Sequence, residues 1–452
     1  CADPNPEGPG IREDEINTPF EGEYSSQYQK VNIGSYGIVK NVKKLEKLKS
    51  YTLSVNIWPT LPIGKRQIII SWNNSKSNSA ALGISKQGKL FGEIGQTKIG
   101  HNITLIPRTW YNVWFSYDDD NKTISISLKH LSPRNTIKET ETTITAVLSA
   151  SKGFFGPIIF AAEKNREMTS HFNGKIEQPQ IFNSVVGKNN LSKPNNINCV
   201  ASWDFSKDIS SINLVDTSPS NLTGELINMP ARAMTGSNWT GKEMSWRHAP
   251  EQYGAIHFHD DDLHDCNWNT SFEYIIPNDL PSGIYAAKIS DGEHEDKIPF
   301  IVCPPINTRV ADLCVIIPTF TYIVYANHAR PNYSNAWQKR SNQWGAYPFN
   351  PADNRQFGLS TYNFHSDESG ICNSSWLRPI LTMRPGYFHF VDEKGSGLRH
   401  FQADTHIIDW LEEKELAYDL ITDHELHKEG IKNSQININL SFKNNLIQRS
   451  LI

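Results

Sequence analysis

A stretch rich in histidine and aspartate contains the side chains most obviously suited to chemistry. Its ionisable members are His257, His259, Asp260, Asp261, Asp262, His264 and Asp265. Because alternate residues of an extended strand share one face, His257 and His259 are expected to point the same way, with Asp261 following them. Two imidazoles and a carboxylate can bind zinc or iron. The stretch therefore predicts either a three-ligand metal site or a strand whose polar side meets another domain.

Two tyrosine-rich segments, residues 318–328 and 358–367, form a second group. The first carries Tyr322 and Tyr325, and the second carries Tyr362. A free phenol has a pKa of about 10, and a bound cation makes its anion the stable form. Phenolates are hard oxygen ligands that suit a trivalent ion such as Fe(III). On the residues alone, the three tyrosines are interpreted as ordinary core or rim aromatics rather than as metal ligands.

The motifs of the common hydrolases and nucleotide-binding enzymes do not occur. The sequence contains no GxSxG, P-loop, GxGxxG or HExxH pattern. Its six cysteines form no CxxC pair and have no zinc-finger spacing, which favours a reducing, cytoplasmic compartment. The formal net charge of −4 comes without a basic run, so nucleic acid is not an expected partner. No apolar run reaches the length of a membrane span, so no membrane partner is expected either.

The elements that must position the tyrosines follow one another in the last third of the chain. They are a strand at 313–318, an amphipathic helix at 404–414, a strand at 416–422 and a short helix at 423–429. Alternating strands and helices predict an α/β layer with a largely parallel sheet. Such sheets bind ligands at their carboxyl edge, which puts the expected site at residues 319–327.

The preceding sequence is predominantly β. Residues 51–58 and 123–128 alternate apolar and polar side chains, as half-buried strands do. Strands about ten residues apart predict a two-sheet sandwich. The segments 110–115 and 172–176 resemble laminin-G/concanavalin-like jelly rolls, so we expect that fold over residues 31–207.

The fold class predicted for the whole chain is multidomain β plus α/β. The predicted parts are an extended segment at 1–30 that ends a missing domain, the sandwich at 31–207, a connector and small β unit at 208–305, an α/β domain at 306–430 and a tail at 431–452. The α/β domain is the expected location of the site.

Together, the histidine–aspartate stretch and the tyrosine-rich segments resemble the large (beta) subunit of N,N-dimethylformamidase, an iron-dependent amide hydrolase. In that family one ferric ion is held by two tyrosinates and one glutamate. The resemblance therefore implies Tyr322 and Tyr362 as the phenolate ligands, while Tyr325, one helical turn after Tyr322, competes with it. Because the family's iron lies at the tyrosines, the resemblance favours a structural or interdomain role for residues 257–265.

The resemblance also implies a fold, an activity and partners. The α/β domain is expected to be an incomplete layer of glutamine-amidotransferase type. The implied function is an amidohydrolase that cleaves small N-substituted formamides, such as N,N-dimethylformamide to dimethylamine and formate, with a mononuclear Fe(3+) as Lewis acid. The family's large subunit pairs with a small subunit and then dimerises, so we expect a small amide substrate, a small subunit and self-association.

The chain departs from the family after about Gly430. The family's glutamate ligand and a catalytic histidine lie in a His-Pro-Glu motif, and no such motif follows here. We therefore expect a truncated family member whose tail, 431–452, does not resemble the family. The alternative function is a non-catalytic β-sandwich binding or assembly protein that keeps the scaffold without the site.

Overall fold

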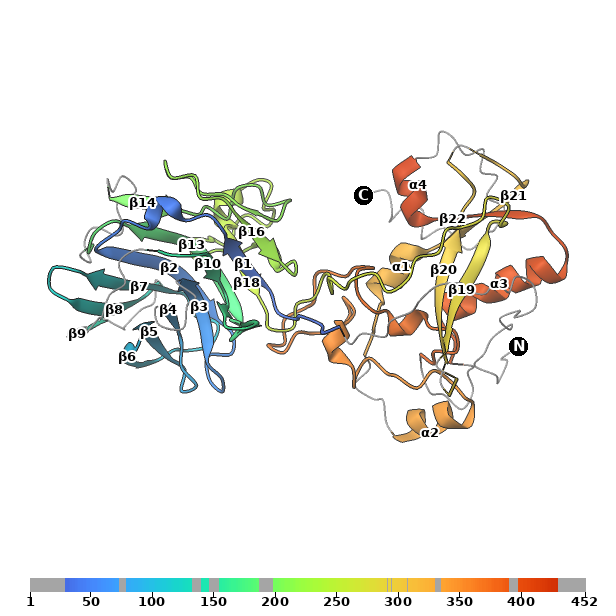
Figure 1. Ribbon diagram of the computed structural model, residues 1–452, viewed down its shortest axis with the longest axis horizontal. Coiled ribbons are helices and arrows are strands. Elements are labelled where there is room, and N and C mark those ends of the chain that lie inside the picture. The colour runs from blue at the N-terminus through green and yellow to red at the C-terminus, as the bar shows by residue number, and fades with distance from the viewer. Residues whose placement is uncertain are drawn as a thin grey trace. The chain divides into compact units, whose positions relative to one another are not determined.

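The computed structural model describes residues 29–429 except for 73–78, 132–139, 146–153, 187–197, 291, 294, 307, 330–334 and 390–396 (Figure 1). The described chain divides into two compact units. The β unit combines Val31–Cys266 with the short segment Phe364–Asn373. The α/β unit contains Asn267–Asn363 and the described residues from Ser374 onward.

The β unit consists of two large sheets, each with eight strands in the described part of the chain. The first sheet contains, in spatial order, β15 (Asn213–Leu214), β16 (Gly224–Ile227), β1 (Tyr36–Val39), β10 (Ile158–Phe160), β3 (Gln67–Trp72), β4 (Ala80–Ile84), β5 (Lys89–Ile94) and β6 (Thr97–Thr104). The second contains β17 (Ala231–Met234), β18 (Ala255–Phe258), β13 (Gly174–Phe182), β2 (Tyr51–Pro59), β7 (Tyr111–Asp118), β8 (Thr123–His130) and β9 (Thr140–Thr145), with β14 (Cys199–Ser202) also paired to β13. Smaller elements are η1 (Lys43–Leu45), η2 (Pro250–Gln252) and the hairpin of β11 (Glu163–Lys164) and β12 (Met168–Thr169).

One continuous hydrophobic core joins the two sheets. Trp72 of β3 meets Phe115 of β7 with ring centroids 5.9 Å apart, and Tyr51 of β2 lies 6.1 Å from Trp72. All three side chains are fully or almost fully buried. Aromatic side chains supply large buried areas and pack edge to face, as here. The chain is therefore mostly β, and its β unit is a sandwich, as the alternation of residues 51–58 predicts.

The sandwich extends beyond the range that the sequence predicts. Residues 208–258, interpreted from sequence as a connector and the start of a small β unit, contribute β15 to β18 to the two sheets. Each of these strands has two to four residues. Runs this short show too little alternation to be recognised, so the strands depend on pairing with partners distant in sequence.

A close approach between the sheets gives a first prediction. A Cβ added at Gly92 of β5 would clash with the ring of Phe115. We expect Gly92→Val to lower the free energy of unfolding by about 1–3 kcal/mol, because overpacking forces side chains out of their rotamers. Gly100→Val in β6 is the matched control, since a Cβ there meets no atom within 4 Å. Urea unfolding of both variants checks the prediction, and equal stabilities would contradict it.

The α/β unit is built on a parallel strand pair. β21 (Leu313–Ile317) pairs with β22 (Tyr418–Thr422), and α3 (Phe401–Glu413) lies between them in sequence. α1 (Thr319–Val324) follows β21 directly, and α4 (Asp423–Glu429) follows β22. The other elements are the hairpin of β19 (Gly283–Ser290) and β20 (Glu295–Val302), α2 (Asn335–Gln343), η3 (Arg355–Phe357) and η4 (Leu381–Met383). Among the described residues, none of these helices is long and apolar enough to cross a membrane.

Candidate functional site

The tyrosine-rich segments meet at the carboxyl end of β21. Tyr325, at the end of α1, stacks on Tyr362 with ring centroids 4.4 Å apart and an interplanar angle of 9°. The Arg399 guanidinium carbon lies 4.7 Å from the centre of the Tyr325 ring. His400 packs against the same ring at 4.4 Å. Two phenols, a guanidinium and an imidazole are thus brought together within the α/β unit.

Hydrogen bonds to the end of α1 hold Tyr362 in place. The buried Ser360 hydroxyl donates to the Val324 carbonyl at 3.0 Å, and Thr361 donates to the same carbonyl through its hydroxyl at 3.0 Å. The Tyr362 backbone N–H donates to the Ser360 hydroxyl, also at 3.0 Å. Because Val324 immediately precedes Tyr325, this turn places the two tyrosines beside each other.

The two phenols interact directly. The contact with the Tyr362 side chain, followed by partial burial, raises the pKa of Tyr325, while Arg399 acts in the opposite direction. An anion on one phenol opposes ionisation of the other. Two neighbouring phenolates therefore need a cation close to both oxygens.

Tyr322 has different surroundings. Its side chain is 2% exposed, whereas that of Tyr362 is 55% exposed. The Tyr322 hydroxyl donates to Asp404 Oδ2 of α3 at 2.6 Å. Burial and the Asp404 carboxylate raise the pKa of Tyr322 strongly. The sequence left Tyr322 and Tyr325 as alternatives, and the ring that lies against Tyr362 is that of Tyr325.

Two histidines flank the tyrosine pair. The His328 ring centroid lies 6.0 Å from that of Tyr325 and 6.3 Å from that of Tyr362. His400 precedes α3 with φ 56° and ψ −124°, a sparsely populated conformation that costs roughly 1–3 kcal/mol. Arg399 and His400 could not be recognised from the sequence, because they lie in the turn before a helix and belong to no recognisable motif.

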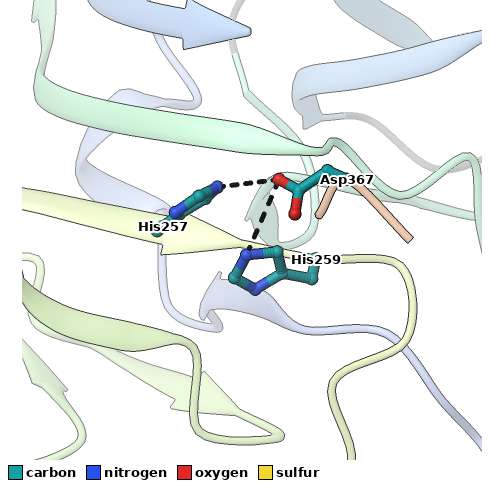
Figure 2. A group of neighbouring side chains, drawn as sticks. All are labelled: His257, His259 and Asp367. Carbon is teal, nitrogen blue, oxygen red and sulfur yellow. Dashed lines mark hydrogen bonds and ion pairs between the residues drawn. The ribbon is translucent and has the colours of Figure 1, made fainter. Parts of the chain in front are cut away.

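The histidine–aspartate stretch forms a compact cluster in the β unit. β18 carries His257, and the chain leaving the strand carries His259, with the two rings 4.1 Å apart. Asp367 lies against both: its Oδ2 is 3.1 Å from His257 Nε2 and 3.8 Å from His259 Nε2 (Figure 2). His365 stacks on His259 with ring centroids 3.7 Å apart. His257, His259, His365 and Asp367 are all buried.

The expectation that His257 and His259 share one face agrees with this geometry. The carboxylates nearest to these two histidines are those of Asp367 and Asp262, however, and not that of Asp261. Asp261 accepts hydrogen bonds from His365 Nδ1 at 2.7 Å and from the Ser366 backbone at 2.8 Å. Asp262 contacts His259 instead, with 3.1 Å between His259 Nδ1 and Asp262 Oδ2. The sequence could not indicate Asp367 as a partner of His257, because 110 residues separate them.

Charge and burial oppose each other in this cluster. Burial lowers the pKa of His257 to about 4. Burial also disfavours the Asp367 carboxylate, but hydrogen bonds from His257 and Ser369 outweigh it and hold the pKa of Asp367 far below its usual range. For His259 the contact with Asp262 outweighs burial and raises the pKa. The residues that could hold a metal here form two overlapping groups, His257–His259–Asp367 and His259–Asp262–His365.

Comparison with known proteins identifies the family. Residues 231–441 match the C-terminal region of the N,N-dimethylformamidase beta subunit-like family. The chain is 31% identical over 466 residues to the N,N-dimethylformamidase beta subunit of Alcaligenes sp. It is also 31% identical over 467 residues to that of Paracoccus aminophilus. The chain belongs to the N,N-dimethylformamidase beta subunit family.

The two dimethylformamidase beta subunits match almost all of this chain, but this chain matches only part of each of them. Each alignment covers 95% of this chain but 60% of the relative, so the chain spans 60% of the length of these relatives. The family resemblance that the sequence predicts is confirmed. The family match continues to residue 441, past Gly430, where the sequence suggested that the resemblance ends.

The solved structures that match this chain are only distantly similar to it. A Ruminococcus gnavus sialidase CBM40 domain bound to α2,3-sialyllactose matches 36% of this chain and 94% of its own, with 13% identity and a TM-score of 0.29. A SAP-like pentraxin from Limulus polyphemus matches 39% of this chain and 82% of its own, with 12% identity and a TM-score of 0.28. Similarities this low give no information about function.

Proposed function

We propose that this chain is the iron-binding subunit of an amidohydrolase that cleaves small N-substituted formamides, with N,N-dimethylformamide yielding dimethylamine and formate. Membership of the dimethylformamidase beta subunit family supports the reaction class. The stacked Tyr325–Tyr362 pair is the observation on which the proposal rests. A small subunit is a proposed partner, in keeping with the name beta subunit of the two relatives, and a second copy of the chain is the other.

The tyrosine pair fits a ferric ion. The rings of Tyr325 and Tyr362 stack on each other at the carboxyl end of a parallel strand pair, where α/β sheets bind ligands. A trivalent cation stabilises both phenolates, which otherwise repel each other. We therefore assign Tyr325, rather than the Asp404-bound Tyr322, as the partner of Tyr362. A ferric ion held by Tyr325 and Tyr362 would supply Lewis acidity for attack on an amide carbonyl.

The groups around the pair suit the remaining steps of hydrolysis. Imidazoles transfer protons near neutral pH, and His400 lies directly against Tyr325. We assign His400 to carry a proton from the attacking water to the departing amine. Arg399 favours the phenolate form of Tyr325. Because a tertiary formamide has no N–H to donate, the exposed aromatic faces would pack against its methyl groups.

The experiment that tests the proposal is an assay of the full-length chain loaded with ferric iron. We expect formate and dimethylamine to appear in equal amounts from N,N-dimethylformamide, in proportion to bound iron. Acetate release from N,N-dimethylacetamide, measured in parallel, reports how strictly the site selects formamides. A folded chain that binds one iron and releases no product from either amide would contradict the hydrolase assignment.

A further inference from the structure

The histidine–aspartate cluster of the β unit has the spacing of a metal site. Ligand atoms around a tetrahedral zinc ion, bonded at about 2.0–2.1 Å, lie roughly 3.3 Å from one another. Asp367 Oδ2 is 3.1 Å from His257 Nε2 and 3.8 Å from His259 Nε2, values on either side of that spacing. In Figure 2 both rings point a nitrogen toward the same carboxylate oxygen. All three residues are buried, so the rings and the carboxylate are held in place by packing.

Neighbouring groups bind the other polar atoms of two of these ligands. Asp262 Oδ2 contacts His259 Nδ1 at 3.1 Å, and the same oxygen also accepts from the Ser35 hydroxyl at 2.6 Å. Asp367 Oδ1 accepts from the backbone and the hydroxyl of Ser369 at 2.9 and 2.5 Å. Metal-bound histidines commonly donate their second ring N–H to a carboxylate in this way. His259 Nε2 lies 2.9 Å from the Ser369 hydroxyl, so a metal ion bound to His259 Nε2 and Asp367 Oδ2 would replace that contact and the hydrogen bond between His257 and Asp367.

The histidine–aspartate cluster contains more carboxylates than positively charged partners. Lys65 pairs with Asp260, and Lys175 on β13 donates to Thr235 and lies near Glu177. The carboxylates of Asp261, Asp262 and Asp367 remain next to the three imidazoles, of which those of His259 and His365 are stacked. A divalent cation between the imidazole nitrogens and the Asp367 carboxylate would offset part of this negative charge.

We propose that His257, His259 and Asp367 bind a divalent transition metal of the zinc type. Two imidazoles and one carboxylate suit such an ion, whereas the paired phenols of the α/β unit suit a trivalent one. His257 lies on β18, His259 directly follows this strand, and Asp367 belongs to Phe364–Asn373, so the metal would fasten this late segment to the sandwich. The alternative group, His259–Asp262–His365, is less suitable, because Asp262 Oδ2 already accepts hydrogen bonds from the Ser35 hydroxyl and from the His259 backbone N–H.

A metal titration of the full-length chain tests the site. Protein stripped with a chelator is titrated with cobalt(II), whose visible bands report tetrahedral nitrogen and oxygen ligation, and then with zinc. We expect one equivalent of cobalt, its displacement by one equivalent of zinc, and a rise in melting temperature of at least about 5 °C with excess zinc. Stripped wild-type protein that is folded but takes up neither ion would overturn the proposal.

Single substitutions show which residues bind the metal. Asp367→Asn and His257→Asn are expected to lose the cobalt bands, whereas His365→Asn and Tyr362→Phe are expected to keep them. Circular dichroism establishes that each variant is folded before its binding is compared with wild type. Loss of the bands in Tyr362→Phe, with retention in Asp367→Asn, would assign the ion to the tyrosine pair and refute the site in the β unit.

Discussion

Tyr362→Phe is expected to lower formate release from N,N-dimethylformamide by more than about 100-fold. Loss of groups that merely orient a metal ligand already costs about 10–100-fold in metal affinity or activity, and this change removes a ligand itself. The ring and its stacking on Tyr325 remain, so the fold should not change. Initial rates and bound iron, measured on the same preparation, check the prediction.

The control for this variant is Tyr274→Phe, which removes the hydroxyl of another exposed tyrosine in the α/β unit. We expect wild-type iron content and rates from it. Equal rates for Tyr362→Phe and Tyr274→Phe would show that the Tyr362 phenol has no part in the reaction, and the proposed mechanism would then be wrong.

The second large effect is expected in the β unit. Asp367→Asn, studied without added metal, should lower the free energy of unfolding by about 3–5 kcal/mol. The substitution keeps the shape of the side chain but removes the charge that accepts from His257 and Ser369 in a buried site. Urea unfolding followed by tryptophan fluorescence measures the change.

Glu368→Gln is the matched control for Asp367→Asn. Glu368 directly follows Asp367, but its side chain is exposed. Its carboxylate forms an ion pair with Arg108 at 3.8 Å. Exposed pairs of this kind contribute little, so we expect a change within about 0.5 kcal/mol. If Asp367→Asn were no more destabilising than Glu368→Gln, the buried cluster would not be holding Phe364–Asn373 on the sandwich.

The parts of the fold that could be predicted from sequence are those with local periodicity. The alternation of residues 51–58 anticipates β2, and the apolar run at 313–318 anticipates β21. The strands β15 to β18 could not be anticipated, because they are short and gain their stability from partners distant in sequence. Two parallel strands in the described residues support an α/β element without establishing a sheet of glutamine-amidotransferase type.

The candidate sites show the same limit. Residue types identified both the tyrosines and the histidine–aspartate stretch. The choice between Tyr322 and Tyr325 depends on the point at which α1 ends, since one side chain enters the core and the other reaches Tyr362. Asp367 completes the cluster through a turn far along the chain. Spacing in sequence carries no information about such contacts.

The most direct test of the tyrosine pair is the visible absorption of the iron-loaded chain, recorded for wild type, Tyr322→Phe, Tyr325→Phe and Tyr362→Phe. Tyrosinate bound to ferric iron gives a charge-transfer band. We predict a coloured wild type, a coloured Tyr322→Phe, and strong loss of the band in the other two variants. A folded but colourless wild type, or a band that depends on Tyr322 and survives Tyr325→Phe, would contradict the assignment and favour a scaffold without this iron site.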